Sequence, residues 1–149
     1  MESSKLSEHV IREWADEQGL PNLSFAELDY RLARAIGAIY QDDFLKSRLI
    51  MKGGTAINKF LLKETSRLSV DLDFNQIGRK EQVLKERRSI RERIVTLLKE
   101  QDTRCDIHFK RAYEQTTIKA RYRTVLGNTQ QFKVEISHIE RFAILEPVD

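Results

Sequence analysis

The sequence predicts an α+β domain in which a mixed or antiparallel sheet packs on helices. Three observations support this fold class. Apolar residues recur at helical spacing within residues 7–39 and again within residues 80–101. Polar and apolar residues alternate in three segments between residues 105 and 137, which is typical of half-buried strands. A short apolar stretch within residues 48–52 and a second alternating segment at residues 70–74 predict further strands.

Composition and charge are those of an ordinary globular protein. The chain has 149 residues, of which 40% are hydrophobic and 33% charged, with a formal net charge of +3. We expect one domain over residues 1–149, with a helical extension at 1–23 and the core at 24–149. The single cysteine, Cys105, excludes an internal disulfide, and no segment has the roughly 20 apolar residues of a membrane helix. A cytoplasmic protein without a membrane partner is therefore expected.

Two helices are expected before the first strand. The first runs from Ser7 to about Gln18, because serine is a good N-cap and Gly19 a good stop signal. Ser24 and Glu27 have the S-x-x-E spacing of a capping box, which predicts that the second helix begins there. Its core stripe comprises Phe25, Leu28, Leu32, Ala35, Ile36 and Ile39.

The middle of the chain is predicted as strand, turn, helix, strand and long helix. The two strands, residues 48–52 and 70–74, flank a Gly53-Gly54 turn and a helix over residues 55–63. The long helix covers Lys80–Gln101. Its basic residues are expected on a solvated face and include Arg87, Arg88 and Arg91.

Three antiparallel strands are predicted next, at residues 105–113, 117–125 and 131–137, with a final extended piece at 142–148. Alternation in the second strand buries Ile118, Ala120, Tyr122 and Thr124 and turns three basic residues outward: Lys119, Arg121 and Arg123. If the third strand is its hairpin partner, matching core faces require an odd loop around Gly127-Asn128. Lys119 or Arg121 then lies opposite Glu135.

Carboxylates gather on the open face of the predicted sheet. Asp71 and Asp73 point the same way, opposite to Leu72 and Phe74. In the last strand the core face is Phe132, Val134 and Ile136, and the open face is Lys133, Glu135 and Ser137. Neighbouring carboxylates repel each other unless a cation lies between them, and oxygen ligands suit Mg²⁺ or Mn²⁺. Three residues are therefore candidate metal ligands and catalytic groups: Asp71, Asp73 and Glu135.

The glycine turn suggests a phosphate site. Gly53 and Gly54 have no Cβ, the helix after them offers free N–H groups, and Thr55 adds a hydroxyl, so a triphosphate fits there. Plainer alternatives exist for each motif. The glycines can form only a turn, and the Asp-x-Asp pair can be a solvated strand face. The stripe of Lys119, Arg121 and Arg123 can serve solubility rather than contact triphosphate or RNA.

Three stretches, "LIMKGGTAI", "SRLSVDLDF" and "KVEIS", resemble the nucleotidyltransferase toxins of the AbiEii/AbiGii abortive-infection type, in the DNA polymerase β-like nucleotidyltransferase superfamily. The resemblance covers roughly residues 25–144. It implies a palm-like sheet, although nothing in this sequence corresponds to the usual C-terminal helical half. By match, Gly53, Gly54 and Thr55 contact phosphate, Arg67 and Ser69 line the nucleotide site, and Asp71, Asp73 and Glu135 form the acidic triad.

The resemblance also implies an activity. It predicts Mg²⁺-dependent transfer of a nucleoside monophosphate from an NTP to RNA, tRNA included, or to a protein. Such an enzyme would be a toxin restrained by a cognate antitoxin protein. The alternative is a truncated module that binds a nucleotide or a partner protein without catalysis.

Overall fold

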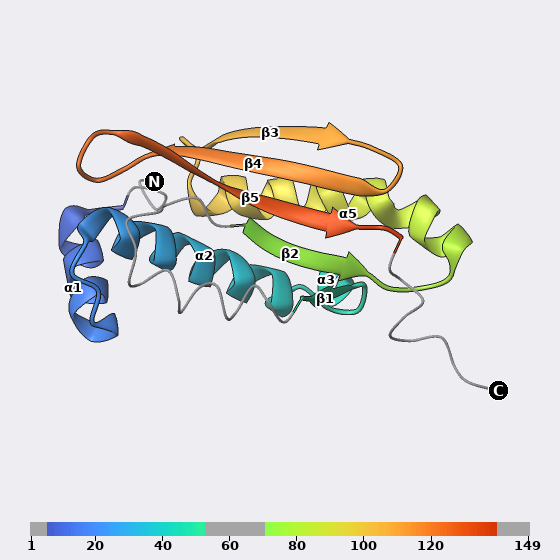
Figure 1. Ribbon diagram of the computed structural model, residues 1–149, viewed down its shortest axis with the longest axis horizontal. Helices are drawn as coiled ribbons and strands as arrows, with labels where there is room; N and C mark the ends of the chain where they lie inside the picture. Colours follow the sequence, from blue (N-terminus) through green and yellow to red (C-terminus); the bar gives the residue numbers. More distant parts are fainter. Residues whose placement is uncertain (1–5, 53–70, 140–149) are drawn as a thin grey trace.

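The computed structural model describes residues 6–52 and 71–139 (Figure 1). Its elements are, in chain order, α1 (Glu8–Gln18), α2 (Leu23–Gln41), α3 (Asp43–Lys46), β1 (Leu49–Met51), β2 (Asp71–Gln76), α5 (Lys80–Gln101), β3 (Asp106–Arg111), β4 (Gln115–Arg123) and β5 (Thr129–Ser137). The predicted α+β class is confirmed. The expected glycine turn and its helix, and the extended piece at 142–148, lie outside the described residues, as do Arg67 and Ser69.

Within the described residues the sheet is mixed and has five strands in the order β1-β2-β5-β4-β3. Among these described strands, β2 and β5 run parallel and the other neighbours are antiparallel. Figure 1 shows α5 passing behind β4 and β5. Helix residues such as Leu28, Ile39 and Ile94 form one hydrophobic core with Phe74, Ile118 and Val134 of the strands. The alternate strand positions therefore face away from the helices and form an open face.

The caps of the first two helices show one confirmed and one wrong prediction. Ser7 caps α1 by accepting a hydrogen bond from the Val10 N–H at 3.2 Å, and Gly19 ends it with a φ of 68°. The capping box is wrong, because α2 begins earlier. Asn22 caps it, its Oδ1 accepting from the Phe25 N–H at 2.9 Å. Glu27 is thereby left inside the helix.

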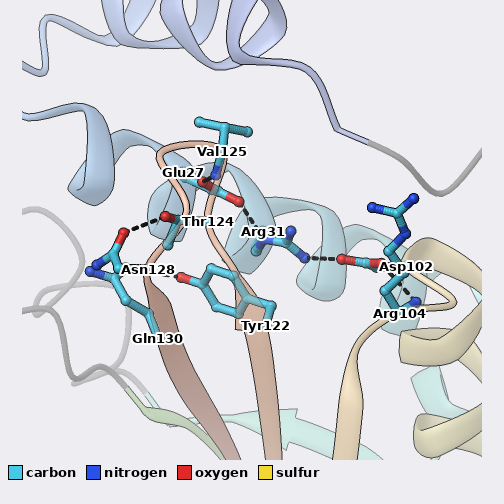
Figure 2. Close-up of polar contacts among 9 residues, drawn as sticks. All are labelled: Glu27, Arg31, Asp102, Arg104, Tyr122, Thr124, Val125, Asn128 and Gln130. Atoms are coloured by element: carbon cyan, nitrogen blue, oxygen red, sulfur yellow. Dashed lines mark hydrogen bonds and ion pairs between the residues drawn. The ribbon is translucent and has the colours of Figure 1, made fainter.

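Glu27 instead anchors a buried polar network (Figure 2). Its side chain is fully buried and accepts hydrogen bonds from the Val125 N–H at 2.8 Å and from Arg31 Nε at 3.1 Å. Arg31 also donates to Asp102 at 2.8 Å, and its guanidinium lies 4.0 Å from the centroid of the Tyr122 ring. The network ties the β4–β5 turn and the end of α5 to α2. It thereby holds the sheet in place on its helices.

The pairing of β4 with β5 corrects the predicted register. The connection is odd, as expected, but it joins Arg123 to Thr129, and the Thr124 N–H donates to the Asn128 carbonyl at 2.7 Å. The turn contains Gly127 and Asn128, as expected, but it closes one or two residues earlier than a pairing of Glu135 with Lys119 or Arg121 requires. Thr117 lies opposite Glu135, and Lys119 lies opposite Lys133. The prediction that Lys119 or Arg121 faces Glu135 across the hairpin is wrong.

A buried histidine fastens the end of β5. His138 Nδ1 lies 2.7 Å from Gln76 Oε1 and Nε2 lies 2.8 Å from Thr116 Oγ1, while Gln76 Nε2 donates to the Val83 carbonyl at 3.0 Å. Burial, with a smaller effect of Arg87, lowers the pKa of His138 to about 4. The ring is therefore neutral, donates from Nδ1 and accepts at Nε2. The adjacent Ser137, expected on the open face, is only 8% exposed.

The long helix has the bounds that the sequence predicts, but not the expected solvated face. Arg88 is exposed, in agreement with the prediction. Arg91 is only 7% exposed, and its guanidinium lies 4.2 Å from the centroid of the Phe109 ring of β3. Arg87 donates to the Tyr113 carbonyl at 3.1 Å. The prediction is wrong for Arg91, because the edge of the sheet covers this part of the helix, whereas Arg87 stays partly exposed. No helix within the described ranges is long and apolar enough to cross a membrane.

Candidate metal centre

The parallel pairing of β2 with β5 brings the three predicted carboxylates together. Asp71 pairs with Lys133, and Asp73 pairs with Glu135. Alternation places all four side chains on the open face, since Leu72 and its neighbours point into the core. One oxygen from each of Asp71, Asp73 and Glu135 lies within 4.8 Å of the other two, and all three residues are half-buried. The strands therefore build a compact cluster of carboxylates.

The environment of the cluster disfavours the ionised form in the absence of a cation. Burial, followed by the charge of Asp73, raises the pKa of Asp71, and Lys133 lowers it in part. Burial also raises the pKa of Glu135, with further contributions from Asp71 and Asp73. Three ionised carboxylates in one half-buried position repel one another, and a bound cation would offset that repulsion.

The donor atoms suit a hard divalent ion. The group contains carboxylate oxygens alone, which fits Mg²⁺ or Mn²⁺ better than the nitrogen and sulfur ligands typical of zinc sites. Asn75 lies two residues after Asp73, on the same face of β2. Its Oδ1 is buried, and it has no hydrogen-bond partner among the described residues. An unsatisfied buried oxygen beside three carboxylates is consistent with a site for a cation or its water ligands.

A hollow on the open face extends from Glu135 across β4 to β3. Its basic lining comes from three strands and consists of Lys133, Lys119, Lys110 and His108. Of the predicted basic stripe, only Lys119 borders this hollow. Arg121 pairs with Gln131 and Arg123 with Thr129. Each is two residues farther along β4 from Glu135 than the one before it, and two residues of a strand span about 7 Å. The structure places the three on the face that holds the carboxylates but at increasing distance.

Two members of this region were not identified as site residues from the sequence. Lys133 is expected on the open face, but only the parallel pairing of β2 and β5 shows that it lies beside Asp71. Asn75 follows the Asp-x-Asp pair at the same two-residue interval, and that spacing was the available signal. The predicted phosphate ligands Gly53, Gly54 and Thr55 lie outside the described residues and stay predictions.

An open sheet face that carries clustered carboxylates beside lysines is the arrangement expected of a metal-dependent phosphoryl-transfer domain. A family model described as "Nucleotidyl transferase AbiEii toxin, Type IV TA system" matches residues 34–149, more than three quarters of the chain. The chain belongs to the AbiEii nucleotidyltransferase toxin family, and the resemblance seen in the sequence is confirmed. No curated protein and no solved structure matches the chain.

Proposed function

We propose that this chain is a Mg²⁺- or Mn²⁺-dependent nucleotidyltransferase that transfers a nucleoside monophosphate from an NTP to RNA. It acts in the cytoplasm as the toxin of a type IV toxin–antitoxin system, and a cognate antitoxin protein restrains it. One observation carries the proposal: in a chain of the AbiEii family, three carboxylates lie within 4.8 Å of one another on the open sheet face.

The proposed roles follow from position and charge. Asp71, Asp73 and Glu135 hold the divalent ion, which when bound supplies charge stabilisation for the reacting phosphate. Lys133, beside Asp71, contacts the triphosphate and keeps the neighbouring carboxylates ionised. Lys119 follows Lys133 across the hairpin and continues the positive charge over the hollow.

RNA is the acceptor that the hollow favours. Its basic lining begins beside Glu135, at Lys133 of β5, and extends across two further strands, which suits a ligand with several phosphates in a row. A protein side chain needs no such extended positive surface. We therefore place the acceptor strand over β4 and β3, with the nucleotide near β2.

The test is incubation with each NTP carrying a label on either the α- or the γ-phosphate, together with Mg²⁺ and total RNA. We expect label from the α-phosphate, and none from the γ-phosphate, to become attached to RNA. Asp73→Asn should lower the rate by about a hundred- to a thousandfold, the range for removal of one group that stabilises transition-state charge. Glu114→Gln, which removes an exposed carboxylate outside the cluster, should leave it unchanged. Label on protein instead of RNA, or NTP binding without any transfer, would contradict the proposal.

A further inference from the structure

A second basic surface lies on the helix side of the sheet, where α5 passes the edge strand β3. We call it the arginine–aromatic surface and define it as Arg87, Arg88, Arg91, Phe109, Arg111 and Tyr113. The four arginines and Tyr113 line one hollow, and Phe109 joins them through its contact with Arg91. Arg111 pairs with the buried Thr116, which places it on the helix side rather than with the carboxylates.

The positive charge of this surface is poorly balanced. Among the described residues, the ion pairs of its arginines go to Glu92, which lies 3.0 Å from Arg88 and 3.9 Å from Arg91. Burial lowers the pKa of Arg91, and the nearby charges of Arg111 and Arg88 lower it further. Four guanidinium groups thus share a small region, and the described ion pairs of two of them go to the same carboxylate. Bound anions would offset their mutual repulsion.

The aromatic rings remain accessible although arginines contact them. The guanidinium of Arg91 lies 4.2 Å from the centroid of Phe109, and that of Arg87 lies 5.7 Å from the centroid of Tyr113. Even so, Phe109 is 49% exposed and Tyr113 is 56% exposed. Arginines therefore hold both rings in place while leaving ring surface for another flat group to stack on.

We propose that the arginine–aromatic surface binds single-stranded nucleic acid, with phosphates on the arginines and bases stacked on Phe109 and Tyr113. Guanidinium groups match phosphate oxygens in a two-pronged geometry, and every base offers a face to an aromatic ring. An acidic protein segment would use the charges but not the exposed rings.

Position connects this surface with the candidate metal centre. Phe109 borders the hollow that reaches Glu135 on the open face, and it also contacts Arg91 on the helix side. A single-stranded RNA whose end lies near the carboxylates can therefore cross β4 and pass around the edge of β3 onto the arginines. That the surface guides the acceptor RNA rests on the proposed function, whereas the binding itself does not.

Fluorescence anisotropy of a labelled oligouridine tests the binding in EDTA and without NTP, so that no catalysis is needed. The variant Arg88→Gln/Arg111→Gln removes two exposed charges, and Arg12→Gln/Arg104→Gln removes two exposed charges elsewhere. We expect the first pair to weaken binding about tenfold and to reduce the salt slope by about 1.4, at roughly 0.7 per lost phosphate contact. The second pair should stay within about twofold of the wild type.

A ring substitution separates stacking from charge. Tyr113→Ala should weaken binding about tenfold and leave the salt slope unchanged, because a stacked base is lost but no phosphate contact. Thermal unfolding of each variant confirms that it folds. No binding at low salt, equal losses for both arginine pairs, or tighter binding of polyglutamate than of oligouridine would overturn the proposal. Asp73→Asn should still bind oligouridine, because Asp73 lies outside the arginine–aromatic surface. A wild-type protein that binds oligouridine but attaches no label to RNA would contradict the proposed function alone.

Discussion

Replacing Asp73 by asparagine is expected to stabilise the metal-free protein. Its carboxylate oxygen lies within 4.8 Å of oxygens of both Asp71 and Glu135. At that separation two unit charges repel by about 1 kcal/mol in a water-like medium and by about 3 kcal/mol at the effective dielectric of a protein surface. Because the cluster is half-buried and Lys133 offsets part of the repulsion, we expect the free energy of unfolding in EDTA to rise by about 1 kcal/mol.

The pH for this comparison follows from the pKa shifts. Burial and repulsion raise the pKa of Asp71 and Glu135 above the unfolded-state values. The folded state therefore holds these protons more tightly, and the cluster becomes more destabilising as pH rises through the raised values. The measurement belongs well above the ordinary range of carboxyl groups, at about pH 8, where this destabilisation is largest.

Mg²⁺ should reverse the order of stability. A ligand that binds the folded state alone adds about 2.7 kcal/mol at one hundred times its Kd, so the wild type gains more than the variant gained in EDTA. Urea denaturation with and without Mg²⁺ measures both effects. The control Glu114→Gln should shift stability by less than about 0.5 kcal/mol in either buffer. A wild type whose stability does not change with Mg²⁺, or a variant destabilised equally in both buffers, would show that the carboxylates have a structural role instead.

Three further outcomes are expected. The free energy of unfolding should fall by up to roughly 3 kcal/mol between about pH 6.5 and 4, because His138 binds a proton in the unfolded chain but stays neutral in the folded one. His138→Gln should flatten this pH dependence in urea titrations. Glu27→Ala should lower the free energy of unfolding by about 3 to 5 kcal/mol, since it leaves Arg31 and the Val125 N–H inside the protein without this partner. Lys133→Met should weaken NTP binding about tenfold in calorimetric titrations and leave nucleoside binding nearly unchanged.

Each of these outcomes has a contrary result. If the stability of His138→Gln falls between about pH 6.5 and 4 as that of the wild type does, other groups cause the pH dependence. A Glu27→Ala variant as stable as wild type would mean that water replaces the carboxylate in the network. Equal losses of NTP and nucleoside affinity in Lys133→Met would indicate a distorted strand rather than a lost phosphate contact.

The sequence predicted best those features whose signals are local. The bounds of α5 follow from a long apolar stripe, and the ends of α1 from Ser7 and Gly19. The core faces of β4 and β5 follow from strict alternation. The open-face position of Asp71 and Asp73 follows in the same way, because alternation needs no knowledge of neighbouring strands.

Long-range pairing set the limit of the prediction. Glu27 matched a local capping pattern, yet its partner is Val125, 98 residues along the chain. The register between β4 and β5 depended on hydrogen bonds between Thr124 and Asn128 that loop composition alone did not specify. The position of Lys133 beside Asp71 needed the parallel pairing of two strands far apart in sequence. Those pairings decide which charges meet at the candidate site.

Binding of Mn²⁺ to the carboxylate cluster, followed by the loss of the free-ion EPR signal, is the most direct test of the metal centre. We expect the wild type to bind Mn²⁺, and Asp71→Asn, Asp73→Asn and Glu135→Gln each to lose at least about tenfold in affinity. Glu114→Gln should bind as the wild type does. Wild-type affinity in all three cluster variants, or no binding by the wild type at millimolar Mn²⁺, would contradict a metal centre at these residues.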